Sequence, residues 1–334
     1  MAALTLVCLA GAGQPAGAGE ADPAPSGGGV GIRLLDAPVS RRDDPRASRY
    51  IVDHLSPGTV IQRRVLVANA SENPYLVELY PAAAMVERGR FVFGADRLAN
   101  DLSSWMSVEP AALDLAPGEE MPAVVTVNVP RTASAGERYA VVWASVASEP
   151  ERPGYVRQVQ RIGVRVYLEV GMGGESPSTF GFGPLRADRD VHGFPMVSVK
   201  VVNTGGRALD LSGTAELTDG PAGTRAGPFK VPNGTTLGPG QSSTVTVRFP
   251  RELPDGPWTI AVHLESGTVK NSMTARITFA GSTGEPVDGP AIPWLAIVGT
   301  ALGIALLMVS GLVRRGRRSY SHVPDEARTP PMSA

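Results

Sequence analysis

The residues best suited to catalysis or metal binding are four histidines, His54, His192, His263 and His322. No two of them are spaced as in HExxH, the pattern that places two imidazole ligands on one face of a helix. Thiolates are the other common zinc ligands, but the only cysteine, Cys8, lies in an N-terminal apolar run that we expect to be removed. A GxSxG nucleophile elbow is also missing from the sequence. We therefore predict no catalytic residue, no metal site, no cofactor and no enzymatic activity.

A compact run of mixed charge, RRDDPRAS, occupies residues 41–48. Such a run could bind an acidic or zwitterionic polymer of a cell wall. It is more often a solvated segment that leads into a strand, and we favour this second interpretation. Two sequences, Asn69-Ala-Ser and Asn233-Gly-Thr, match the pattern of a glycan acceptor. None of these features identifies ligand-binding residues, which stay unknown at this point.

The composition narrows the classes of protein and partner. One hydrophobic core rarely serves more than about 250 residues, so a chain of 334 residues has room for two domains and further segments. The 39 glycines and 30 prolines favour many short strands joined by turns. The 31 Lys and Arg residues nearly balance the 32 Asp and Glu residues, which gives no electrostatic basis for binding nucleic acid. A single cysteine excludes a disulfide scaffold.

Apolar and polar residues alternate in many short stretches between residues 32 and 280, as in half-buried β-strands. Val125, Val127 and Val129 alternate with polar residues in AVVTVNVP, and the same spacing recurs in STVTVRFP, which begins at residue 243. We predict further strands in RRVLVAN, PYLVELYP, RYAVVWASV, RIGVRVYLEV, MVSVKVVN, WTIAVHL and ARITF. No stretch of this region is a convincing amphipathic helix of three turns, so the predicted fold class is all-β.

A four-residue phrase recurs three times, as LSPG at 55–58, LAPG at 115–118 and LGPG at 237–240. We expect the leucine to fill the core, the proline to restrict φ, and the glycine to supply the positive φ of a type II turn. The second and third copies each precede an alternating strand, a loop and another strand, and each half of the chain has an earlier strand that ends in Asn. We therefore predict two tandem immunoglobulin-like β-sandwich domains, at 32–172 and 180–280.

Both ends of the chain carry sequences typical of membrane targeting. Residues 1–31 are predicted to be a signal peptide and a flexible linker; the positive segment that usually begins a signal is missing, which a start codon further upstream would explain. Residues 291–313 contain no charge and are long enough to form a single transmembrane α-helix. The basic cluster that follows predicts a cytoplasmic tail at 314–334. The predicted membrane-anchor residues are Trp294, Arg314, Arg315, Arg317 and Arg318.

Part of the chain resembles a known family. The stretch DPRASRYIVDHLSPGTVIQRRVLVANASENPYLVELYPAAAMVERGRFVF and the later GERYAVVWA are similar to the N-terminal domain of bacterial WxL-interacting proteins, over about residues 32–170. The order of signal, two β-sandwiches, one span and basic tail also agrees with that family. The resemblance implies a membrane-anchored surface protein whose first domain binds peptidoglycan and whose second domain binds another ligand, such as a host or partner protein. The Ala, Gly and Arg usage suggests an actinobacterial-type member.

Our leading hypothesis from the sequence is a non-enzymatic cell-surface protein that binds peptidoglycan or another surface protein. We expect it in the cell membrane as a single-pass protein, with its ectodomain outside, one helix in the lipid bilayer and its C-terminus in the cytoplasm. Neither nucleic acid nor a small-molecule substrate is an expected partner. The alternative is a chaperone-like or secretion-apparatus module that adds a partner strand to an exposed sheet edge.

Overall fold

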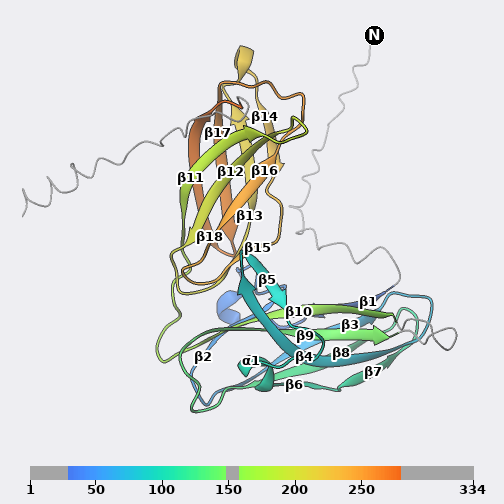
Figure 1. Ribbon diagram of the computed structural model, residues 1–334. Helices are drawn as coiled ribbons and strands as arrows, with labels where there is room; N and C mark the ends of the chain where they lie inside the picture. Colours follow the sequence, from blue (N-terminus) through green and yellow to red (C-terminus); the bar gives the residue numbers. More distant parts are fainter. Residues whose placement is uncertain (1–28, 148–157, 280–334) are drawn as a thin grey trace, which may run out of the picture. The chain divides into compact units, whose positions relative to one another are not determined.

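The computed structural model describes residues 29–147 and 158–279 (Figure 1). The chain divides into two compact units, residues 1–287 and 288–334, and the second unit lies outside the described residues. The predicted span 291–313, the predicted tail 314–334 and most of the predicted leader therefore lie outside them as well. So do the predicted anchor residues, Trp294, Arg314, Arg315, Arg317 and Arg318. Within the described ranges, no helix has the length and apolar character needed to cross a membrane.

The first β-sandwich consists of two sheets. One sheet is antiparallel and has the strand order β1 (Val30–Leu34), β3 (Val60–Asn69), β8 (Glu120–Asn128) and β6 (Met106–Glu109). The other has the order β2 (Ile51–Leu55), β10 (Val159–Val170), β9 (Gly136–Ala147), β4 (Tyr75–Glu87) and β5 (Arg90–Phe93), and β7 (Ala112–Leu115) also pairs with β4. The pairing of β2 with β10 is parallel. The short helix α1 (Asp101–Ser104) precedes β6, and a 3₁₀ turn spans Val39–Arg41.

The second β-sandwich also consists of two sheets. One has the order β11 (Phe180–Arg189), β12 (Pro195–Asn203) and β16 (Ser242–Arg248). The other has the order β14 (Ala226–Lys230), β13 (Leu209–Thr218), β17 (Trp258–Ser266) and β18 (Val269–Ile277), and β15 (Thr235–Leu237) also pairs with β13. A second 3₁₀ turn spans Pro221–Gly223.

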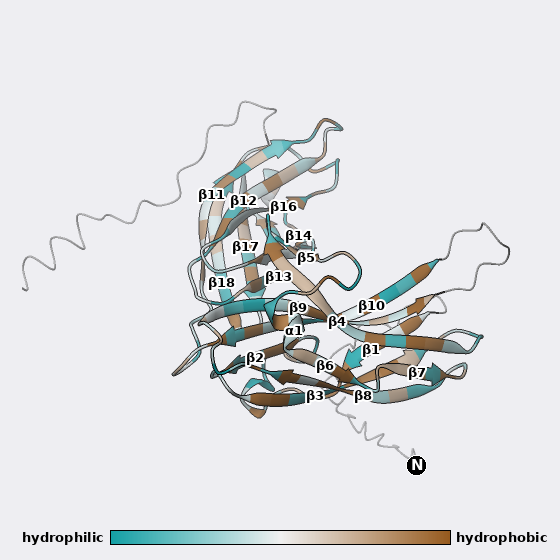
Figure 2. Cartoon of the chain, turned by 60° about the horizontal axis from the view of Figure 1, so that its bottom comes forward, coloured by the Kyte–Doolittle hydropathy of each residue, from teal (hydrophilic) through white to brown (hydrophobic). Residues whose placement is uncertain are grey.

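Alternation of apolar and polar residues puts one face of each strand into a core, as Figure 2 shows by the alternating colours along the strands. Val125 and Val127 of β8 lie in the core of the first sandwich together with Val142 and Ala144 of β9, from the opposite sheet. A separate core fills the second sandwich. The prediction of an all-β fold with immunoglobulin-type sandwiches is confirmed for the described residues.

Each Leu-x-Pro-Gly phrase forms a tight turn between two strands, as predicted. In every copy the residue after glycine donates its amide hydrogen to the carbonyl oxygen three positions earlier, over 3.2, 3.0 and 3.0 Å. Gly58, Gly118 and Gly240 have φ values of 82, 75 and 72°, which a type II turn requires at its third residue. The three leucines are buried in the cores: Leu55, Leu115 and Leu237.

An asparagine at the end of a neighbouring strand holds two of these turns in place. Asn69 ends β3 and Asn203 ends β12, and each is 1% exposed. The side-chain amide of Asn69 donates to the carbonyl oxygen of Leu115 over 3.0 Å, and that of Asn203 donates to Leu237 over 2.9 Å. The strand-end asparagine and the leucine phrase thus form one unit that repeats in both sandwiches. The same contacts bury the amide nitrogen that a glycan would need at Asn69.

The Asn69 contact predicts a measurable loss of stability on substitution. The Asn69 amide donates to three carbonyl oxygens, those of Asn73, Leu115 and Ala116. We expect Asn69→Ala to lower the free energy of unfolding by about 2–3 kcal/mol, because buried acceptors lose their donor. Urea denaturation followed by circular dichroism measures the change. Asn128→Ala, at an exposed position that ends β8, is the control, and a loss no greater than the control's would contradict the assignment.

Candidate functional site

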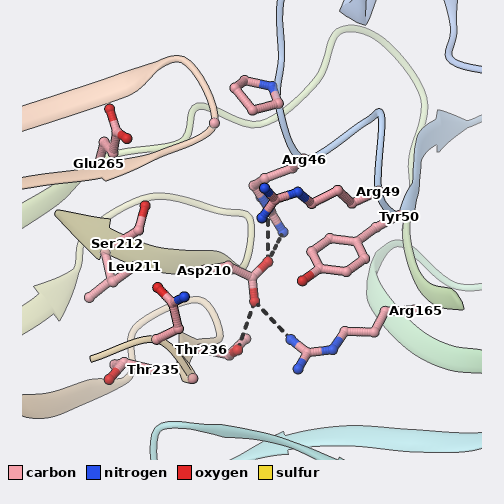
Figure 3. Close-up of a pocket in the computed structure, with 14 residues that line it drawn as sticks. Arg46, Arg49, Tyr50, Arg165, Asp210, Leu211, Ser212, Thr235, Thr236 and Glu265 are labelled. Carbon is pink, nitrogen blue, oxygen red and sulfur yellow. Dashed lines mark hydrogen bonds and ion pairs between the residues drawn. The ribbon is translucent and has the colours of Figure 1, made fainter. Parts of the chain in front are cut away.

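The carboxylate of Asp210, on β13 of the second sandwich, is the centre of a polar cluster between the two sandwiches (Figure 3). Arg46 donates to it from Nε over 2.9 Å, and Tyr167 of β10 donates from its hydroxyl over 2.9 Å. Arg165 of β10 donates over 3.3 Å, and Thr236 of the second sandwich donates over 2.7 Å. Three of these four donors belong to the first sandwich, so Asp210 joins the two sandwiches within the compact unit of residues 1–287.

Arg46 is the most deeply buried cation of this cluster. It is 7% exposed, its guanidinium also donates to the carbonyl oxygen of Ala208 over 2.8 Å, and it lies 4.7 Å from the ring centroid of Tyr167. Burial opposes the charge on Arg46, but Asp210 and Tyr167 outweigh it and raise the pKa of Arg46. A buried guanidinium of this kind is stable only while its carboxylate partner is in place.

A second buried carboxylate, Glu137 of β9, lies on the same boundary. It accepts hydrogen bonds from the backbone amide of Ala208 over 2.7 Å and from the hydroxyl of Tyr139 over 2.6 Å. Burial raises the pKa of Glu137 above its usual range, although both hydrogen bonds oppose that shift. The ring of Phe91 packs against Tyr139 and Tyr167 here, with centroid separations of 6.1 and 5.1 Å. The boundary is therefore closely packed as well as polar.

The hairpin of β4 and β5 makes a further contact with the second sandwich. Gly89, at the tip of the hairpin, accepts the backbone amide of Thr236 over 2.9 Å. The side-chain amide of Gln241 donates to the carbonyl oxygen of Val86 over 3.0 Å. Gln241 directly follows the LGPG phrase, so the repeated turn of the second sandwich also touches the first.

A cavity of about 390 Å³ lies beside the Asp210 cluster. Arg46, Arg49, Tyr50 and Arg165 of the first sandwich line it, opposite Asp210 and other residues of the second, as Figure 3 shows. The residues contributed by the second sandwich are mostly small and polar: Ser212, Asn233, Gly234, Thr235, Thr236 and Gly267, together with Leu211 and Glu265. Three guanidinium groups in one wall suit a carboxylate or another planar anion better than an apolar ligand.

The segment that connects β10 to β11 is bound to both sandwiches. Glu175 in this segment forms an ion pair with Arg41 of the first sandwich, and another with Arg207 of the second over 2.9 Å. His54 of β2 contacts the carboxylate of Glu169 through Nδ1 and the carbonyl oxygen of Gly173 through Nε2, both over 3.1 Å. These contacts fix the connection over most of its length.

The N-terminal half of β10 is an open sheet edge. β9 pairs with all of Val159–Val170, whereas β2 pairs with Val166–Val170 alone. No described strand pairs with Val159–Arg165 on the side away from β9. Ile162 and Val164 in this stretch face the core of the sandwich, and β1 of the other sheet lies beside it (Figure 2). We refer to Val159–Arg165 as the open edge.

The structure corrects one interpretation of the sequence and supplies residues that the sequence did not indicate. The run at 41–48 is not a solvated segment, because Arg41 and Arg46 are 8% and 7% exposed and hold the boundary between the sandwiches. The sequence pattern does not indicate that Asp210 and Arg165 belong to a site, since a charged residue at an alternating strand position usually faces solvent. Of the histidines, His54 contacts Glu169 and Gly173, His192 and His263 are exposed, and His322 lies outside the described residues.

No protein-family model and no curated protein matches the chain. In fold it is similar to the Pseudomonas aeruginosa CupB2 chaperone, with 12% sequence identity and a TM-score of 0.37 over 69% of this chain and 97% of that one. It is similar to the Salmonella enterica SafA pilin in complex with the SafB chaperone, with 14% identity and a TM-score of 0.38 over 75% and 99%. The E. coli chaperone DraB aligns with 14% identity and a TM-score of 0.37 over 69% and 95%.

The leading hypothesis from the sequence, a membrane-anchored surface protein that binds peptidoglycan, is wrong: the solved structures named above, to which the chain is similar in fold, include chaperones. All these TM-scores lie below 0.5, so the choice of partner and binding mode has to rest on the chain's own geometry. The resemblance to WxL-interacting proteins and the expected location in the cell membrane stay predictions.

Removal of the central carboxylate should destabilise the protein strongly. We expect Asp210→Ala to lower the free energy of unfolding by about 3 kcal/mol, because Arg46 is left buried without its counter-ion. Guanidinium denaturation measures the loss. Asp255→Ala is the matched control, since this carboxylate is 63% exposed and also pairs with an arginine, Arg189. Its removal should cost less than about 1 kcal/mol. Equal losses in the two variants would show that the Arg46 charge does not depend on Asp210.

The Glu169 contact predicts how stability depends on pH. Burial of Glu169 favours its neutral form, but hydrogen bonds from Ser176 and His54 outweigh burial and hold the pKa of Glu169 below its usual range. A carboxyl group with a lowered folded pKa stabilises the fold above its unfolded pKa of about 4.5, and this contribution disappears as the pH falls through the folded value. Between about pH 5 and pH 3 the wild type should therefore lose more stability than Glu169→Gln. Thermal unfolding across this range tests the difference, with exposed Glu120→Gln as the control.

Proposed function

We propose that the protein is a chaperone-like module that holds a partner polypeptide by adding one strand of the partner to the open edge. The observation that carries this proposal is that β10 lacks a neighbour over Val159–Arg165, while its C-terminal half is paired on both sides. A sheet edge of this kind presents unpaired backbone groups that pair with an extended segment of another chain. This mode of binding requires a protein partner and no catalytic residue.

Alternate amides of β10 point toward the open side. Gly171, directly after β10, donates its amide hydrogen to the carbonyl oxygen of Leu55 on β2 over 3.1 Å. The amides of a strand point to opposite sides in turn, so every second residue before Gly171 has its amide on the β2 side. Counting back along the strand, this set includes Arg165, Gly163 and Arg161, which lie beyond the end of β2. Their amides are the donors that an added strand would use.

The open edge also has an apolar side. Ile162 is partly buried against the core, as are Ile32 and Leu34 of the neighbouring strand β1. Leu35, directly after β1, is 38% exposed. An added strand with apolar residues at alternate positions would cover these side chains, which contributes to binding at about 25 cal/mol for each Å² of apolar surface removed from water.

The open edge ends at the cavity between the sandwiches. Arg165 is the last residue of the open edge and also lines the cavity, together with Arg49. A partner strand that runs past Arg165 would enter this cavity. The proposed partner is therefore an extended polypeptide segment that reaches the boundary between the sandwiches.

A proline at the open edge tests the proposal. Arg161→Pro removes an amide that faces the open side and leaves the pairing with β9 intact, a position at which edge strands tolerate proline. We expect it to weaken binding of a seven-residue peptide of alternating valine and threonine at least tenfold, measured by fluorescence anisotropy with the full chain. Arg161→Ala removes the same side chain and keeps the amide, so it should bind within about twofold of the wild type.

Hydrogen exchange on the wild type provides a check that does not depend on a variant. The amides of Arg161 and Gly163 should exchange faster than those of Gln160 and Ile162 in the free protein, since only the latter pair with β9. Saturating peptide should slow the exchange at Arg161 and Gly163. Equal affinity of the Pro and Ala variants, with no slowing of exchange, would rule out strand addition at this edge.

A further inference from the structure

The outer surface of the open edge carries an uneven row of side chains. Ile162 and Val164 face the core, so Arg161, Gly163 and Arg165 face outward. Gly163 has no side chain and therefore leaves a gap between the two arginines. A strand added to β10 would meet a cation, a gap and a second cation along this face.

Trp143 of β9 closes the gap from one side. It pairs with Gly163 in the sheet register, and a Cβ atom on Gly163 would lie only 2.8 Å from Cε3 of the indole ring. The ring thus already occupies the space above Gly163. Directly opposite residues of neighbouring strands have Cβ atoms about 4.5–5.5 Å apart, so a partner residue opposite Gly163 would contact the indole with no side chain in between. Trp143 is only 5% exposed, so the partner side chain would meet just the edge of the ring, and an apolar side chain fits this position.

Arg161 carries the charge that is available for selection. Its guanidinium lies 4.5 Å from the ring centroid of Trp143, and the residue is exposed. Among residues 29–147 and 158–279, no carboxylate forms an ion pair with it. Arg165, by contrast, is already paired with Asp210 over 3.3 Å. An acidic residue of an added strand would therefore gain most from a position opposite Arg161.

We infer, on the basis of the proposed strand addition, that the partner strand is selected at two positions of its outer face. One position holds an acidic residue opposite Arg161, and the other, two residues away, holds an apolar residue opposite Gly163. The order is acidic, any residue, apolar in a strand parallel to β10 and the reverse in an antiparallel strand. A lysine in the acidic position is rejected, because like charges directly opposite each other destabilise strand pairing.

Designed peptides measure this selection. Peptides of seven residues in the valine and threonine frame carry Glu and Leu two positions apart, in both orders, and matched peptides carry Lys in place of Glu or Ser in place of Leu. Anisotropy titrations with the full chain give the affinities. We expect both the Lys and the Ser replacement to weaken binding about fivefold in the favoured order. The order that binds better also gives the direction of the added strand.

A charge reversal on the protein makes the test specific to one contact. Arg161→Glu should reverse the preference, so that the Lys peptide binds more tightly than the Glu peptide. Arg97→Glu is the control. Arg97 also lies over an aromatic ring, 3.9 Å from the ring centroid of Tyr80, but it lies in the turn after β5, and Tyr80 is on β4, which β9 separates from β10. The preference for Glu should persist in this control.

The possible results distinguish failure of this selection from failure of the proposed strand addition. If the neutral valine and threonine peptide binds but the Glu and Lys peptides bind equally, the selection is overturned and strand addition stands. The same conclusion follows if Arg161→Glu keeps the wild-type preference. If no peptide binds, the neutral one included, both the strand addition and its selection are rejected.

Discussion

A buried charge is stable only beside a group of opposite charge, and Arg46 places such a charge at the boundary between the two sandwiches. Its guanidinium is buried and Asp210 of the other sandwich neutralises it over 2.9 Å. A packed arrangement that buried Arg46 away from Asp210 would leave an unpaired charge, which costs several kcal/mol. The contact therefore selects this arrangement over other packed arrangements of the two sandwiches.

The local part of the fold could be predicted because its causes are local in sequence. Alternating apolar residues identify strands such as β8 and β16, since the pleat alone decides which side chains reach the core. The Leu-x-Pro-Gly turns follow from the restricted φ of proline and the positive φ of glycine. Even the strand-end residues Asn69 and Asn203 were visible as a repeat. Their role was not, because the carbonyl oxygens they bind belong to turns 46 and 34 residues away.

The candidate site could not be predicted either, because the residues that meet in it are still further apart in the sequence. Arg46 and Asp210 are 164 residues apart in sequence, and neither lies in a motif that fixes its burial. A run such as RRDDPRAS is usually solvated, because charged side chains seldom pay the cost of desolvation. Here the partners come from β10 and β13, and only the packing of one sandwich on the other brings them together. Neither composition nor periodicity indicates which residues that packing brings into contact.

The open edge differs from the edge at β11 in a way that favours its use in binding. The edge strand β11 has a register shift between Phe182 and Leu185. A bulge of this kind discourages pairing with another chain. Pairing of β10 with β9 runs without a shift from Val159 to Val170. The same strand is held at its other end by β2 and by the Asp210 cluster, so the open edge is extended before a partner arrives, and binding loses less conformational entropy.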